Sequence, residues 1–155
     1  MNLINKNNLL EGYIANDLNM NHTKNDIPYL NLLIAIKDFY KDSKTEQYVR
    51  RYQKIPVTVW GSTAEYLQEY AVKGHHIIVQ FKLKTQEKIV LVDQEEKTLL
   101  LPQIIGTAVE LIESKEQVHE RIKLLEKRKQ ELLNSDEFEY EELNELILFT
   151  DDFYM

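Results

Sequence analysis

The feature that most constrains the fold is a change of hydrophobic period at Gly61. Before it, residues 47–60 carry the β-branched residues typical of a strand. After it, apolar residues recur at helical spacing, at Ala64, Leu67 and Ala71. Residues 62–65, Ser-Thr-Ala-Glu, have the form of a capping box, and Gly74 provides a C-terminal stop. The pattern predicts a strand that leads directly into one short helix at residues 62–73.

Further segments alternate as strands on both sides of this junction. The first begins at residue 8 and contains Gly12, which predicts a bulge or a bend. Residues 29–39 are apolar on both faces, which predicts a central strand. Residues 76–85 and 104–112 predict two later strands. Between them, residues 86–103 predict a hairpin excursion that turns at Asp93-Gln94-Glu95-Glu96, and polar turns are expected at residues 22–26 and 41–45.

Three strands, a helix and two strands, in that order, are the elements of the OB-fold. This is a five-stranded Greek-key barrel that binds oligonucleotides across its second and third strands. We therefore predict a mainly β fold with a C-terminal α region, in which residues 1–112 form an OB-fold barrel with one helix between strands three and four.

The sequence after residue 112 is helical and highly charged. A narrow apolar stripe recurs at three- and four-residue spacings, at Val118, Ile122, Leu125 and Leu132, with Lys129 at the missing position. Such a stripe suits a helix of about 20 residues that pairs with one partner. A second helix is expected at residues 139–148, after a turn at 134–136. We divide the chain into a barrel (1–112), a charged helical extension (113–148) and an acidic, aromatic tip (149–155).

The net charge of −7 is unevenly distributed along the chain. Residues 1–112 are balanced, with 13 basic and 13 acidic residues, and residues 113–130 carry a charge of +2. The last 25 residues hold nine acidic residues and no basic one. Charges further apart than about 10 Å are screened from one another at physiological salt. The acidic end therefore does not exclude a nucleic-acid surface on the barrel.

Aromatic and basic residues alternate on the predicted second and third strands. Rings can stack on any base and cations can meet any phosphate, so this pattern indicates binding of single-stranded nucleic acid without sequence preference. The expected stacking residues are Tyr40, Tyr48, Tyr52 and Trp60. The expected phosphate contacts are Lys41, Lys44, Arg50, Arg51, Lys54, Lys82, Lys84 and Lys88. The alternative for each ring alone is a core position, because aromatic residues are enriched in strands generally.

Four stretches resemble the bacterial single-stranded DNA-binding proteins, in phage- or plasmid-type form. They are Asn8–Ile14, Ile34–Asp42, Ile55–Glu65 with its Trp60-Gly61 junction, and Tyr70–Thr85. The resemblance covers about residues 1–112 and rests on the order and spacing of these motifs. It implies an OB-fold, a role in DNA replication, recombination or transfer, stacking by Tyr40 and Trp60, and a homo-oligomer, either a tetramer or a dimer.

The chain departs from this family at three points. Lys54 and the stretch Gln86-Glu87-Lys88 stand where the family often has aromatic residues, which implies fewer stacking positions. Helical sequence replaces the family's flexible linker. The C-terminal tip keeps the chemistry of acidic residues followed by rings, at Asp151, Asp152, Phe153 and Tyr154. By resemblance, this tip would dock replication or recombination proteins, and the alternative is a solubilising end.

Other functions receive little support from the sequence. Cysteine is absent and no long apolar run occurs, so a cytoplasmic protein without a membrane span is expected. His75 and His76 would diverge from a strand, which argues against a metal site. No catalytic motif is present, so neither an enzyme nor a cofactor is expected. The remaining alternative is an OB-fold protein-interaction module that acts through its helical, acidic C-terminus.

Overall fold

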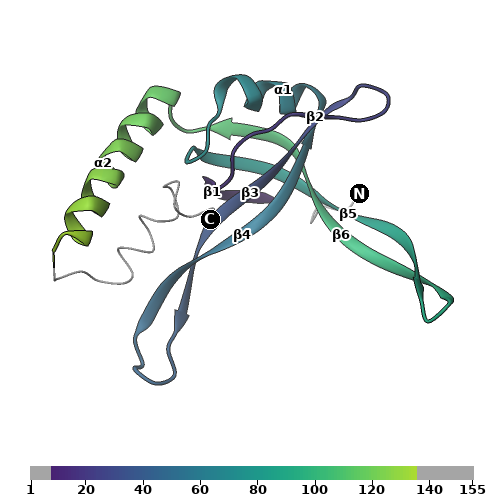
Figure 1. The fold of residues 1–155 in the computed structure, drawn as a ribbon, viewed down its shortest axis with the longest axis horizontal. Coiled ribbons are helices and arrows are strands. Elements are labelled where there is room, and N and C mark those ends of the chain that lie inside the picture. Colours follow the sequence, from purple (N-terminus) through teal and green to yellow (C-terminus); the bar gives the residue numbers. More distant parts are fainter. Residues whose placement is uncertain (1–7, 136–155) are drawn as a thin grey trace.

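The computed structural model describes residues 8–135, which form a closed barrel of five strands with two helices (Figure 1). The barrel consists of β1 (Leu9–Ile14), β3 (Pro28–Lys41), β4 (Tyr48–Trp60), β5 (His76–Val92) and β6 (Glu95–Leu111). The strand order is β1-β5-β6-β4-β3, and pairing of β1 with β3 closes the barrel. Helix α1 (Gly61–Tyr70) connects β4 to β5 and lies across one end of the barrel. The predicted element order is confirmed.

The core forms where the inward faces of these strands meet α1. Its fully buried members include Leu30, Leu32 and Ile34 of β3, Val57 and Val59 of β4, Ile77 and Val79 of β5, and Leu67 of α1. The period-two alternation that predicted these strands therefore marks the barrel interior. A short additional strand, β2 (Asn21–His22), pairs with Pro28 and Tyr29. The turn expected from residue 22 thus begins after His22.

The start and end of α1 differ from the prediction. The helix begins at Gly61, whose φ of +61° allows the chain to turn directly out of β4. Ser62 is therefore already inside the first turn, and no side chain caps the helix. The helix ends at Tyr70, before Gly74, because the backbone at Ala71 is extended and the chain returns toward β1. There the amide of Gly74 donates to the carbonyl of Ile14 at 2.7 Å.

The predicted hairpin excursion is part of β5 and β6 themselves. The two strands pair without interruption from Phe81–Gly106 to Val92–Glu95, so residues 86–103 are not a separate hairpin. The turn is formed by Asp93 and Gln94 alone, both at positive φ, as a tight two-residue turn requires. Glu95 and Glu96 already lie in β6. The result is a long two-stranded arm that extends away from the barrel (Figure 1).

Helix α2 (Lys115–Leu133) packs on the barrel through the predicted stripe. Ser114 caps it and forms a reciprocal capping box with Gln117. Val118 is fully buried, and Leu125 packs against the small buried residues Ala15 and Ala35. The sequence predicts a separate partner for this stripe, whereas in the structure the same chain's barrel provides the contact. The second predicted helix and the tip lie outside the described residues.

Arg121 attaches α2 to the barrel. Its guanidinium donates to the Glu113 carboxylate and, at 2.7 Å, to the carbonyl of Gly74, and it lies 5.3 Å from the centre of the Tyr13 ring. We expect Arg121→Ala to destabilise the fold by about 1–2 kcal/mol, because a partly buried carboxylate loses its cation. Urea unfolding measures this. Lys123→Ala, on an exposed position of the same helix, is the matched control and should change stability by less than about 0.5 kcal/mol.

Candidate nucleic-acid interface

The register of β3 against β4 divides their side chains between two faces. Phe39 lies opposite Arg50, and Lys37 opposite Tyr52, on the face that continues the outside of the barrel. Asp38 lies opposite Arg51, and Tyr40 opposite Val49, on the face that continues the core. We call these the outer and inner faces. Neighbouring residues that look equivalent in the sequence therefore point in opposite directions.

The outer face combines several rings with positive charge. Its cations are Lys37, Lys41, Arg50 and Lys54, and its ladder positions from Tyr29–Trp60 to Lys41–Tyr48 include no acidic residue. Phe39 and Tyr48 are 60% and 76% exposed, so both rings are open to a ligand. Arg50 lies over Phe39, 5.8 Å from the ring centre. Partial burial lowers the pKa of Lys54, although most of its side chain is exposed.

Two outer-face aromatics have packing partners of their own. The Trp60 ring is tilted against Tyr29 at a centroid distance of 4.8 Å, and 41% of Trp60 is still exposed. Tyr52 packs against the Ala15–Ala35 cluster, which Leu125 of α2 also contacts. Helix α2 therefore lies beside this part of the outer face. Of the predicted stacking residues, Tyr52 is the one that packs against this buried cluster.

The inner face of the hairpin is built differently. Arg51 lies over the Tyr40 ring, 4.7 Å from its centre, and its Nε is 3.5 Å from the Asp38 carboxylate. Gln53 also donates to Asp38, at 2.6 Å. The positive charge of Arg51 is thus partly neutralised by this surface ion pair. Although Tyr40 and Arg51 were predicted together with Arg50, the structure separates them from the strongly basic face.

The remaining predicted cations lie at the ends of the two hairpins. Lys41 and Lys44 are exposed at the turn between β3 and β4. Lys82, Lys84 and Lys88 are exposed on one face of the β5–β6 arm, since alternate residues of a strand share a face. Figure 1 shows the two hairpins extending from the barrel in different directions, so these cations border the barrel on two sides.

Three residues of this surface were missed by the sequence reasoning. Tyr29, Lys37 and Phe39 share the outer face with Arg50 and Trp60. The strand register is the signal that finds them. All three are odd-numbered residues of β3, and their partners in β4 are even-numbered. The tip residues Asp151, Asp152, Phe153 and Tyr154 lie outside the described residues.

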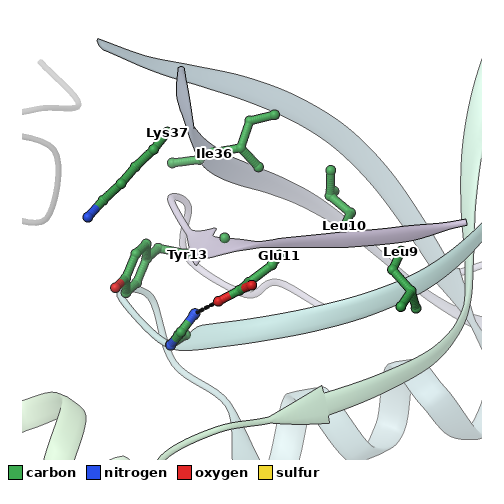
Figure 2. A pocket seen from close by; sticks show the side chains of 9 residues that line it. Leu9, Leu10, Glu11, Tyr13, Ile36 and Lys37 are labelled. Atoms are coloured by element: carbon green, nitrogen blue, oxygen red, sulfur yellow. Dashed lines mark hydrogen bonds and ion pairs between the residues drawn. The ribbon is translucent and has the colours of Figure 1, made fainter. Parts of the chain in front are cut away.

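A pocket of about 450 Å³ lies where β1 separates from β3 (Figure 2). Lys37 reaches its rim from the outer face, which places the pocket beside the basic surface. His76 also lines the pocket, 2.8 Å from Glu11, and stacks on Tyr13 at 4.8 Å. His75 is buried and contacts the carbonyl of Glu113 through Nε2 at 2.6 Å. The two histidines diverge as predicted.

Among residues 8–135, no three His, Asp or Glu side chains gather in a way that could hold a metal ion. No helix in this described part is long and apolar enough to cross a membrane.

Comparison with known proteins agrees with the barrel fold. The profile of the single-strand binding protein family matches residues 5–112. The chain therefore belongs to this family, which confirms the family that the sequence motifs indicated and agrees with the predicted OB-fold. The matched segment ends where the barrel ends.

Solved structures of similar fold include two single-stranded DNA-binding proteins. A deletion mutant from Thermus aquaticus superposes with a TM-score of 0.55 at 22% identity, over 69% of this chain and 50% of that one. A Plasmodium falciparum protein solved in complex with single-stranded DNA superposes with a TM-score of 0.54 at 16% identity, over 68% of this chain and 93% of that one. This chain thus spans about half the length of the Thermus protein.

Proposed function

We propose that this protein coats single-stranded DNA without sequence preference, using the outer face of β3 and β4 as its main contact. Bases stack on Trp60, Phe39 and Tyr48, and phosphates meet Lys37, Arg50 and the neighbouring lysines. The purpose is to protect transient single strands during replication, recombination or transfer in the cytoplasm. The activity is binding alone, without a chemical step or a cofactor.

The observation that carries this proposal is the composition of the outer face. Four cations gather on one face of the β3–β4 ladder, and a polyanion offers phosphates to all of them. Exposed rings between the cations provide stacking that accepts every base. A basic patch without rings would bind phosphates but would offer no surface on which a base could stack.

Titration of the intrinsic fluorescence with oligo(dT) tests this proposal. Trp60 is the only tryptophan, so quenching reports directly on the outer face. We expect strong quenching at low salt, and an affinity that falls as salt rises with a logarithmic slope of about −0.7 for each phosphate contact. The absence of binding at low salt would contradict the proposal and would favour a protein-interaction module.

Two further contacts are proposed for the whole chain. We propose that it self-associates, because the β5–β6 arm exposes large apolar side chains that a monomer leaves in water. We also propose that the C-terminal tip docks replication or recombination proteins, with Asp151 and Asp152 meeting a basic rim and the rings of Phe153 and Tyr154 filling an apolar pocket. Loss of partner binding when only these four residues are replaced would support the second contact.

A further inference from the structure

Helix α2 lies beside the outer face but outside the segment that the family profile matches. The matched segment ends at residue 112, and α2 begins at Lys115. Leu125 packs on the buried residues Ala15 and Ala35, and Tyr52 of the outer face packs on the same pair. Figure 1 shows α2 and the β3–β4 hairpin extending from the barrel toward the same side. The helix therefore borders the proposed DNA contact without being part of the matched barrel.

Positive charge is concentrated in the half of α2 that borders this surface. Residues 115–121 are balanced, with two basic and two acidic residues. Residues 122–133 carry four basic residues and two acidic ones, for a net charge of +2. This charge adds to that of the outer face and favours a phosphate strand between the two.

The helical period shows which of these cations faces the barrel. An α-helix turns by about 100° per residue, so Arg128 lies within about 20° of Arg121, which contacts the Tyr13 ring. Arg128 is exposed and borders the packed side of α2, one turn beyond Leu125. Lys123, which is also exposed, lies about 140° around the helix from Arg128 and points away from the barrel. Arg128 is thus the exposed cation of residues 122–133 that borders the packed side.

We propose that α2 forms a second wall of the single-stranded DNA site, and that Arg128 contacts a phosphate from this wall. This inference rests on the proposed function and adds a contact surface outside the matched barrel. A base that stacks on an outer-face ring leaves its phosphate at the rim of that face, where a long arginine side chain can reach it. The planar guanidinium can donate two hydrogen bonds to one phosphate.

Titration of three variants with oligo(dT) tests this wall. Arg128→Gln should weaken binding about three- to ten-fold at low salt, and the slope of log K against log salt should become shallower by about 0.7. Lys123→Gln makes the same change of net charge on the far side of the helix, so the affinity should stay within about two-fold of the wild type. Arg128→Lys keeps the charge and should preserve the slope. Urea unfolding verifies that all three variants are folded and equally stable.

Hydrogen exchange of the wild type gives a direct readout of the same surface. The amides of residues 125–133 should exchange more slowly when oligo(dT) is bound, because a bound strand holds this half of the helix against the barrel. Residues 115–121 are attached to the barrel already, through the Ser114 cap and Arg121, and their exchange should not change.

The possible results separate this inference from the proposed function. If Arg128→Gln and Lys123→Gln had equal effects, or none, α2 would not be a wall of the site. Tighter binding by Arg128→Gln, or faster exchange in residues 125–133, would mean that DNA displaces α2, which also overturns the inference. In each of these cases Arg50→Gln, on the outer face itself, should still weaken binding, and the proposed function stands. A wild type that does not bind oligo(dT) overturns both together.

Discussion

Arg50→Gln is expected to weaken oligo(dT) binding about ten-fold at low salt, because a charge-assisted contact contributes about 1.5–3 kcal/mol. Arg50 lies on the outer face, over the Phe39 ring and among lysines. Its loss removes one phosphate contact and exposes one side of a stacking ring. The slope of log K against log salt should become shallower by about 0.7.

Arg51→Gln is the matched control for this experiment. The same chemical change is made one residue along the chain, but on the inner face, where Arg51 is bound to Asp38. We expect a loss of about three-fold or less, since surface pairs of this kind contribute about 0–1 kcal/mol. If Arg51→Gln weakened binding as much as Arg50→Gln, DNA would contact both faces of the hairpin, and the outer-face assignment would be wrong.

The contrast between these two arginines shows which features of the site could be predicted from the sequence and which could not. Alternation placed β3 and β4 within two residues of their limits and β5 at its observed start, because burial of one face of a barrel strand imposes a period of two. The sequence also indicated the region of the site, since rings and cations alternate there. It could not divide the site between faces, because that division depends on which residue of β4 lies opposite each residue of β3.

Other differences have local causes that composition does not reveal. A Ser-x-x-Glu pattern predicts a capped helix, but a glycine with positive φ allows α1 to begin one residue earlier. Four polar residues predict a four-residue turn, but two consecutive residues at positive φ are sufficient to reverse the chain. The stripe of α2 predicts a contact without specifying which surface makes it. Pairing and packing between distant segments decide each of these cases.

Gly12→Ala is expected to destabilise the fold by about 3 kcal/mol, which is at the upper end for overpacking of a core. The sequence predicts a bulge or a bend at Gly12, yet β1 pairs in continuous register with β5 from Leu9 to Tyr13. The reason for glycine is close approach to β3. A Cβ at residue 12 would collide with the carbonyl oxygen of Ala35 and lie 2.8 Å from Cγ2 of Ile34. β1 cannot move aside, because β5 and β3 hold it from both sides where the barrel closes.

Gly61→Ala is the control that separates steric contact from backbone strain. Gly61 has a φ of +61°, but no atom lies within 4 Å of a Cβ placed there. Only the strain of a left-handed residue remains, so we expect a loss of about 1–2 kcal/mol. Urea unfolding of the two variants gives both values. If Gly12→Ala were the milder of the two, the barrel would close with space between β1 and β3. The pocket between these strands would then be a flexible opening, and the position of Lys37 beside the basic surface would not be fixed by the fold.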